Sequence, residues 1–340
     1  MRLLVVRFSA LGDVAMTVPV LHSLARRYPQ LHITVVSRPF VEPLFASLPS
    51  NVRFRGVDVK CYPGLVGLWR LFRELRREGV DAVADLHDVL RTQVLRTLFR
   101  LAGKRTASIE KGRSDRRALV RQGARRMLRQ LPTSFNRYEA VFARLGYPVQ
   151  TDFRSIYPSG RGEVTLFQQV TGSPDGKRWI GLAPFAAHRG KMLPAATVEV
   201  LVSRLAGQPG IRLFLFGGGP REREVLECLS AAHVNVQSVA GRLKLDGELA
   251  LMSHLDVMLS MDSANMHLAS LVGTRVVSVW GATHPFAGFL GWGQRQADSV
   301  QLAMPCRPCS IFGNKPCLRG DYACLTGISV EQLVERVLSQ

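Results

Sequence analysis

Short apolar runs alternate with longer amphipathic segments along most of this 340-residue chain. Apolar runs of about four to eight residues are typical of buried strands, and apolar positions repeating every three to four residues are typical of helices. In the first half, this pattern predicts strands over 3–8, 33–37 and 82–86, and helices over 14–28, 65–77 and 90–101. Such alternation favours a parallel α/β sheet.

The alternation is interrupted and then begins again. Residues 103–160 are basic and predicted mostly helical, and glycine-rich loops follow at 159–162 and 171–176. Beyond them the pattern predicts strands over 179–184, 211–216, 234–239, 256–260 and 276–280, and helices over 197–205, 221–231, 246–254, 265–271 and 329–338. We therefore expect two Rossmann-like, doubly wound domains, 1–165 and 166–340, that face a central cleft. The last helix could pack back on the first domain.

Positive charge is concentrated in the first half of the chain. Residues 1–150 contain 27 Lys and Arg against 11 Asp and Glu, whereas residues 151–340 contain 18 against 15. This excess favours an acidic partner: nucleic acid, anionic lipid or a phosphorylated substrate. The chain has no secretory signal pattern and no apolar run long enough to span a bilayer, so we expect an intracellular protein, soluble or peripheral to a membrane.

Ligands bind at the carboxyl ends of strands in doubly wound sheets, so loops after strands are candidates for chemistry. The first is Arg-Phe-Ser-Ala-Leu-Gly-Asp at 7–13. Its Asp13 is either a general base that takes a proton from an acceptor hydroxyl or a helix cap. Gly12 permits a tight turn. Ser9 and Gly12 here, and His87 after the strand 82–86, are candidate acceptor contacts.

Two loops in the second half carry charged residues after predicted strands. Arg189 and Lys191 follow the strand 179–184, where a cation could neutralise a departing diphosphate; a solvated surface pair is the alternative. Gly218 and Gly219 would let a ligand approach the main chain. Glu222 either binds ribose hydroxyls or stabilises the first turn of a helix.

The stretch Asp-Ser-Ala-Asn-Met-His at 262–267 joins a predicted strand to a predicted helix. Asp262 suits the N-cap. The N–H groups of Ser263 and Ala264, the Ser263 hydroxyl and His267 would then surround a phosphate. A lone histidine in a helix is more often structural, but one turn behind a capped helix start it is a better candidate.

Four cysteines lie near the end of the chain: Cys306, Cys309, Cys317 and Cys324. Their spacing suits a structural zinc ion held by four thiolates, with iron as the second choice; reduced thiols without a metal are the alternative. No neighbouring residue indicates a catalytic role, and we expect no cofactor for catalysis.

The tract 91–129 is strongly basic, with 13 Lys and Arg and two acids. It contains a single aromatic residue, which argues against binding of single strands by base stacking. Its leucines make it amphipathic, and a basic amphipathic surface suits an anionic membrane. The candidate contacts are Arg116, Arg117, Arg125 and Arg126, and a solvated helix face is the alternative.

Together these motifs resemble the lipopolysaccharide heptosyltransferase family, glycosyltransferase family nine. The resemblance is carried in order by the 7–13 loop, Lys191 with Pro194, Gly218-Gly219 with Glu222, the stretch 262–269, and Thr283-His-Pro285 after the strand 276–280. It extends over nearly the whole chain. It implies a GT-B fold, in which the first domain binds the acceptor and the second binds the nucleotide sugar.

The resemblance also implies an inverting enzyme that moves L-glycero-D-manno-heptose from an ADP-sugar to the inner core of lipopolysaccharide, at the cytoplasmic face of the inner membrane. By this resemblance Asp13 is the catalytic base, Lys191 contacts the donor phosphates and Glu222 holds the adenosine ribose. The diphosphate and sugar would be lined by Asp262, Ser263 and His267. No Asp-x-Asp occurs in the chain, which argues against a metal-dependent GT-A enzyme.

The chain departs from the family pattern at Ala264, where members often have glycine, and in the weight of its basic tract. Other functions stay open: a transferase that uses another nucleotide sugar, or a non-catalytic protein that binds nucleic acid or anionic lipid, although nucleic acid is not the expected partner. An oxidoreductase needs a Gly-x-Gly-x-x-Gly loop and an acid after the second strand. Here that strand ends Val36-Ser-Arg38, which counts against it.

Overall fold

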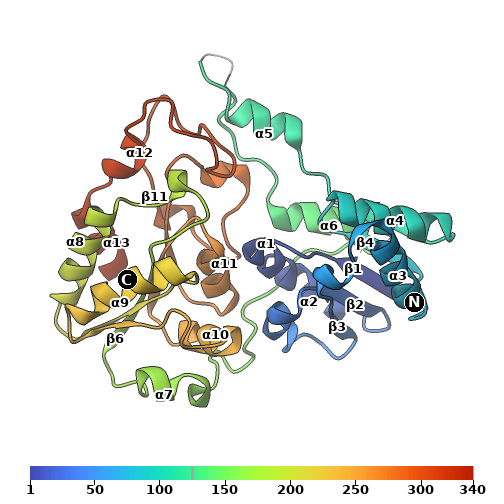
Figure 1. Cartoon of the computed structure of the whole chain (residues 1–340), viewed down its shortest axis with the longest axis horizontal. Helices are drawn as coiled ribbons and strands as arrows, with labels where there is room; N and C mark the ends of the chain where they lie inside the picture. The colour runs from blue at the N-terminus through green and yellow to red at the C-terminus, as the bar shows by residue number, and fades with distance from the viewer. Residues whose placement is uncertain (124–125, 340) are drawn as a thin grey trace. The chain divides into compact units, whose positions relative to one another are not determined.

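The structure is a computed structural model that describes residues 1–123 and 126–339. The chain divides into two compact units (Figure 1). The first unit comprises Met1–Lys111 and Pro132–Ile156, and the second comprises Gly112–Leu131 and Tyr157–Gln340. Each unit has its own parallel β-sheet, as the alternation of strands and helices predicts.

The sheet of the first unit has the strand order β3-β2-β1-β4-β5. Its strands are Arg2–Val6 (β1), His32–Ser37 (β2), Val52–Gly56 (β3), Ala82–Asp85 (β4) and Arg105–Ser108 (β5). Its helices are Leu11–Ala15 (α1), Thr17–Arg27 (α2), Gly64–Arg76 (α3), Leu90–Leu101 (α4) and Ser134–Arg144 (α6), with 3-10 turns at Pro39–Phe45 (η1) and Val59–Cys61 (η2). The helix predicted over 14–28 is thus two helices that meet at Met16.

The sheet of the second unit has the order β11-β10-β9-β6-β7-β8. Its strands are Arg178–Ala183 (β6), Ile211–Leu215 (β7), Val236–Ser238 (β8), Val257–Met261 (β9), Val276–Val279 (β10) and Ser299–Val300 (β11). The longer helices are Arg113–Leu119 (α5), Ala195–Ala206 (α8), Pro220–Ala231 (α9), Leu245–Ser253 (α10), Ala264–Leu271 (α11) and Val330–Leu338 (α13). Short turns are Val164–Leu166 (η3), Gln168–Thr171 (α7), Arg189–Lys191 (η4), Pro285–Ala287 (η5), Gln296–Asp298 (η6) and Ala323–Thr326 (α12).

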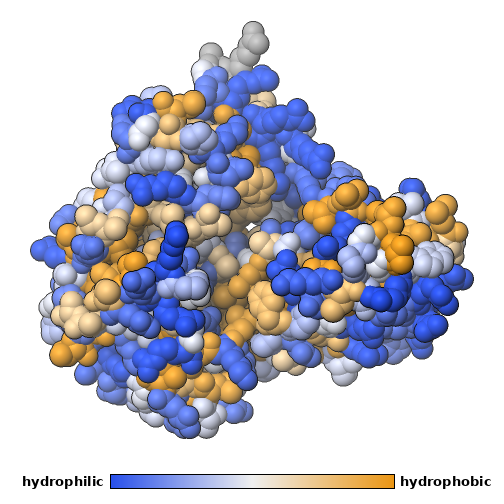
Figure 2. Space-filling model, viewed as in Figure 1, coloured by the Kyte–Doolittle hydropathy of each residue, from blue (hydrophilic) through white to orange (hydrophobic). Residues whose placement is uncertain are grey.

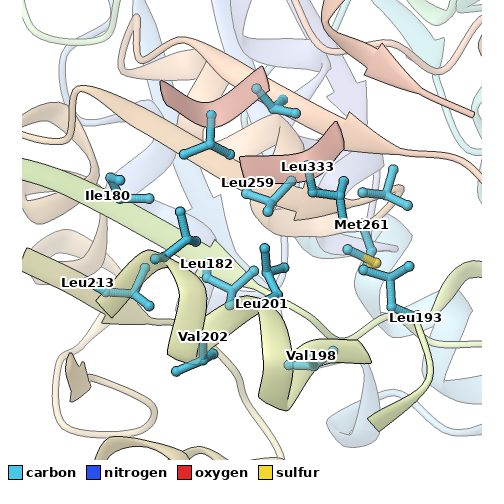
Figure 3. Packing of buried hydrophobic residues seen from close by; sticks show 14 of the residues in the cluster. Ile180, Leu182, Leu193, Val198, Leu201, Val202, Leu213, Leu259, Met261 and Leu333 are labelled. Carbon is cyan, nitrogen blue, oxygen red and sulfur yellow. The ribbon is translucent and has the colours of Figure 1, made fainter. Parts of the chain in front are cut away.

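The core of the second unit forms between its sheet and the helices on one face. Leu201 of α8 points toward the strands that carry Leu182 (β6) and Leu259 (β9) (Figure 3), and these three residues and Val202 of α8 are fully buried in one cluster. Leu333 of α13 belongs to the same cluster. The last helix, predicted as a possible contact with the first domain, packs within its own unit, because its apolar stripe completes this core.

The basic segment Gly112–Leu131 belongs to the second unit, although it interrupts the sequence of the first. After it the chain returns to the first unit and leaves again at Tyr157, nine residues before the boundary expected at 166. Seven arginines and one aspartate lie in this segment. Much of the positive charge of the first half is therefore attached to the second unit.

None of the helices in the described part of the chain has the length and apolarity needed to cross a bilayer.

Candidate functional site

Asp13 lies in the first turn of α1, shortly after β1. Its Oδ2 atom is 2.8 Å from the guanidinium of Arg7 and accepts a hydrogen bond of 3.3 Å from the backbone N–H of Ala10. Arg7 is buried, donates to the carbonyl of Leu86 and lies 5.8 Å from the ring centre of Tyr138. The carboxylate therefore stabilises the helix start, and with 33% of its side chain exposed it can still meet a ligand.

Ser9 and His87 come together after β1 and β4. Ser9 Oγ and His87 Nε2 are 3.3 Å apart. Burial lowers the pKa of His87 to about 4, helped by the charges of Arg7 and Lys111. The imidazole is therefore neutral at neutral pH, and it can hydrogen-bond to an acceptor but supplies no cation. Gly12 forms no separate turn, because it is already the second residue of α1.

Asp85, which the sequence analysis did not single out, shapes the turn that carries His87. Its buried carboxylate accepts hydrogen bonds from the N–H groups of His87 (3.0 Å) and Asp88 (2.8 Å) and pairs with Arg96 (2.9 Å). Asp88 adopts a left-handed conformation with φ 49°. The sequence does contain a signal for this role: Asp85 ends an otherwise apolar strand, and a buried charge at such a position needs a local partner.

The central feature of the second unit is an ion pair between Lys191 Nζ and Asp262 Oδ2, 3.0 Å apart, with the side chains 15% and 4% exposed. Strands β6 and β9 are neighbours, with Ala183 opposite Ser260, so the loops that follow them leave the sheet side by side. No hydrogen bond reaches Asp262 Oδ2 from any described residue, because the contact with Lys191 lacks hydrogen-bond geometry. That oxygen is buried, and its described partner is the Lys191 ammonium.

The start of α11 differs by one residue from the prediction. Ser263, not Asp262, is the N-cap, because the Asp262 carboxylate is directed to Lys191. The Ser263 hydroxyl lies 3.2 Å from that of Ser260 and makes no side-chain bond to the helix. The N–H groups of the first turn, which begins at Ala264, are thus left without a side-chain cap, which suits an anion. His267, also buried, lies one turn further along.

The glycine loop after β7 is closed by Glu222. Its Oε2 atom accepts a hydrogen bond of 2.8 Å from the N–H of Gly218. Gly217 is required by packing, since a Cβ there would lie 2.7 Å from Leu226 Cδ1. At Gly219, by contrast, a Cβ would meet no atom within 4 Å. Glu222 therefore closes the loop through Gly218, and the space beside Gly219 is open.

The cysteine-rich loop supports the Lys191 loop. The Gly190 carbonyl accepts a hydrogen bond of 2.8 Å from the N–H of Ala282. A Cβ at Gly313 would lie 2.6 Å from Lys191 Cγ, so glycine lets the two loops touch. The exposed Arg189 guanidinium lies 5.5 Å from the ring centre of Tyr322.

The predicted metal site is not assembled. No three His, Cys, Asp or Glu side chains within 1–123 and 126–339 converge as a metal ion would require, and Cys306, Cys309, Cys317 and Cys324 are all free thiols. Cys324 is buried in the apolar core, and burial raises the pKa of its thiol to about 11.

Buried Arg307 holds this loop instead. Its guanidinium donates to the carbonyls of Gly281, Thr283 and Leu302 and to the side-chain oxygen of Gln301. Burial lowers the pKa of Arg307 to about 10, so it stays charged at neutral pH. No spacing rule in the sequence singles this arginine out.

Two of the four arginines predicted to contact a membrane bind other parts of the second unit, and the membrane contact itself stays a prediction. The Arg116 guanidinium lies 4.9 Å from the ring centre of Phe289. Arg126 donates to the carbonyl of Arg307. Arg117 is exposed and bonds to the carbonyl of Arg113 in its own helix, and Arg125 lies outside the described residues.

Comparison with known proteins adds a family pattern and full-length relatives. The pattern described as glycosyltransferase family 9 (heptosyltransferase) matches residues 68–315. Lipopolysaccharide heptosyltransferase 1 of Pseudomonas aeruginosa is 27% identical, over 91% of this chain and 86% of the relative. The protein of the same name from Escherichia coli K12 is 25% identical, over 87% of this chain and 92% of the relative.

A solved structure, the ADP-heptose lipopolysaccharide heptosyltransferase II of E. coli, superposes with a TM-score of 0.71 at 20% identity, over 99% of this chain and 97% of that one. The predicted GT-B fold is thereby confirmed.

Proposed function

The chain belongs to glycosyltransferase family 9, the heptosyltransferases, and on that premise we propose that it transfers heptose from ADP-heptose to the inner core of lipopolysaccharide or to a related acidic glycolipid. Glycosyl transfer follows from the family. The donor and acceptor are inferred from the relatives, which are named as lipopolysaccharide heptosyltransferases. The observation that carries the proposal is the buried Lys191–Asp262 pair beside the uncapped start of α11.

The donor would bind to the second unit. Its diphosphate would accept hydrogen bonds from the first-turn N–H groups of α11 and contact Lys191. Asp262 would hold the Lys191 ammonium beside the diphosphate and line the sugar site. Glu222 would bind the ribose beside the open space at Gly219, and His267 and Arg189 would complete the surroundings of the diphosphate.

The reaction would be a single displacement with inversion. Asp13 takes the proton from an acceptor hydroxyl, and the oxygen attacks the anomeric carbon. The bond from that carbon to the diphosphate oxygen breaks, and ADP leaves with the electron pair. Lys191 and the α11 amides stabilise the charge that develops on the diphosphate. Arg7 holds the Asp13 carboxylate in place, and Ser9 and His87 would contact the acceptor.

We place this reaction at the cytoplasmic face of the inner membrane, because the acceptor is a glycolipid, and we assign it no catalytic cofactor. A structural zinc or iron ion would need the four late thiols to move together from their present positions. Elemental analysis of protein purified without added metal tests this: about one ion per chain supports it, and none removes it.

The test of the function is transfer of heptose from ADP-heptose to a heptose-free, deacylated core acceptor, followed by mass spectrometry. We expect a single added heptose with the parent chain and loss of more than about 100-fold in rate with Asp13→Asn, which keeps the shape but not the base. Calorimetry with ADP, GDP and UDP accompanies it, and Asp13→Asn should bind ADP as the parent does.

The outcomes separate the alternatives. Preference for GDP or UDP would keep the transferase and remove ADP-heptose as the donor. Binding of no nucleotide would remove the enzymatic proposal and favour a protein that only binds lipid or nucleic acid. Full activity of Asp13→Asn would remove Asp13 as the base.

A further inference from the structure

The large apolar side chains that the first unit exposes gather mainly at one edge of its sheet. Strands β1 to β5 are parallel, so their carboxyl ends share an edge. The segments that follow β2, β3 and β4 expose Phe40 (53%), Leu65 (73%), Val66 (82%), Trp69 (49%) and Leu90 (78%). We call these five residues the apolar edge. Apolar side chains also lie among polar ones over α3 and α4 in Figure 2.

The most exposed part of the apolar edge is held outward by the packing of α3. This helix buries Leu68, Leu71, Phe72 and Leu75 in the core, so Val66 and Trp69 lie on its other faces. Leu65 lies one turn before the buried stripe, at the exposed start of the helix. A Cβ at Gly67 would lie 2.3 Å from the Tyr62 carbonyl carbon, so the preceding loop fits closely against the helix. These apolar side chains cannot turn inward without unpacking the unit.

Cationic side chains accompany the apolar ones. The segment 57–73 contains Lys60, Arg70 and Arg73 against one acid, Asp58, whose carboxylate accepts a bond from the Lys60 N–H. Arg38, before Phe40, is also exposed. Tryptophan and leucine beside lysine and arginine are typical of proteins that lie in the interface of a bilayer, where each cation near anionic lipid contributes about 1 kcal/mol.

We propose that the apolar edge docks on an anionic phospholipid bilayer, with Leu65, Val66 and Trp69 inserted among the headgroups and Lys60 and Arg70 on lipid phosphates. Its use rests on the proposed function, because Asp13 follows β1 at this same edge and a bilayer-held glycolipid would offer its sugars there. The surface differs from the tract 91–129, part of which, Gly112–Leu131, belongs to the second unit.

The test is co-sedimentation of the whole chain with vesicles of phosphatidylglycerol and phosphatidylethanolamine, and with neutral phosphatidylcholine vesicles. The variant Leu65→Ser/Val66→Ser/Trp69→Ser should bind anionic vesicles about tenfold or more weakly. Leu101→Ser is the matched control, because Leu101 is 79% exposed at the far end of α4, and it should bind as the parent does. The tryptophan fluorescence of the parent should shift to the blue with anionic vesicles only, and Trp69→Phe should remove that shift.

Equal vesicle binding by the triple variant and the parent would overturn the proposal. So would a dimer of the parent in sedimentation that is lost in the triple variant, because the apolar edge would then be a contact between two copies of the chain. The deacylated-acceptor assay reads the proposed function separately, since it needs no bilayer. The triple variant should keep its rate on that acceptor and lose rate on acceptor embedded in anionic vesicles. A parent chain that binds vesicles but transfers nothing would remove the function and leave the docking surface.

Discussion

Removal of the Lys191 charge tests the centre of the second unit most directly. The Asp262 carboxylate is 4% exposed, and its described partner is the Lys191 ammonium at 3.0 Å. Lys191→Met keeps most of the side-chain volume and leaves a buried anion without its cation. Asp262→Asn removes the opposite charge, and the double variant Lys191→Met/Asp262→Asn removes both.

The magnitude follows from the distance and the burial. At 3.0 Å and an effective dielectric constant of about 20, the attraction is about 5 kcal/mol, and the desolvation of both groups offsets much of it. We expect Lys191→Met to lower the free energy of unfolding by about 3 kcal/mol and Asp262→Asn by about 2, because the lysine is nearer to water. The double variant should lose only about 1 kcal/mol, since no charge is left unpaired.

The assay is urea unfolding followed by tryptophan fluorescence, which reports mainly on the second unit because Trp179, Trp280 and Trp292 lie there. Calorimetry with ADP is run on the same samples. We expect Lys191→Met and the double variant to bind ADP poorly, although the stability of the double variant is nearly restored. Asp262→Asn leaves the Lys191 ammonium without its anion and should bind ADP more tightly than the parent does.

Two results would refute this reasoning. If the loss of unfolding free energy in the double variant equalled the sum of the losses in the single variants, the two residues would not interact. The 3.0 Å contact would then contribute nothing to stability. If the double variant transferred heptose at the parent rate, the pair would be structural alone, and the donor site would have to lie elsewhere in the chain.

Three further predictions follow from single contacts. The pKa of His87 is about 4 in the folded chain, below its ordinary value of 6.5. Between these pH values the unfolded chain binds more protons than the folded chain, so the free energy of unfolding falls as the pH drops from 6.5 to 4. His87→Gln should reduce that loss in thermal melts. Glu222→Ala frees the Gly218 N–H and should weaken ADP binding about tenfold by calorimetry, whereas Glu222→Gln, which can still accept that bond, should weaken it less. Arg307→Ala leaves three carbonyls without their donor and should cost about 3 kcal/mol in urea unfolding, with Arg307→Lys intermediate; an unchanged midpoint would contradict its supporting role.

The sequence pattern located the central strands and the edge strand β8, and it missed the edge strands β3, β5 and β11. Strands β1, β4, β6 and β9 are buried on both faces and read as continuous apolar runs, which the pattern detects. Strands β3 and β5 lie at the two edges of the first sheet, and they contain Arg53, Arg55 and Arg105. Charges on edge strands protect against wrong pairing, but they also erase the apolar signal.

The site was predictable as a set of loops but not as contacts. Lys191 and Asp262 were each expected after a strand, yet their ion pair depends on β6 lying beside β9, and neither strand's sequence specifies that order. The basic segment Gly112–Leu131 reads as a charged surface, whereas stacking of Arg116 on Phe289 attaches it to the second unit. Distant aromatic partners of this kind leave no periodic trace in the sequence.

On the proposed function, the Lys191–Asp262 pair would explain how a carboxylate can lie beside a site for a diphosphate. An isolated Asp262 anion next to the start of α11 would repel phosphate, and an isolated Lys191 would hold the product ADP tightly after transfer. Paired at 3.0 Å, the two charges nearly cancel, and the α11 amides supply the attraction for the incoming donor. In the proposed reaction, Lys191 would shift toward the diphosphate as charge develops on it, and the ammonium would return to Asp262 when ADP leaves. The carboxylate thus competes with the product for the same cation, which favours release, and Lys191→Met/Asp262→Asn should abolish both the stabilisation and the competition.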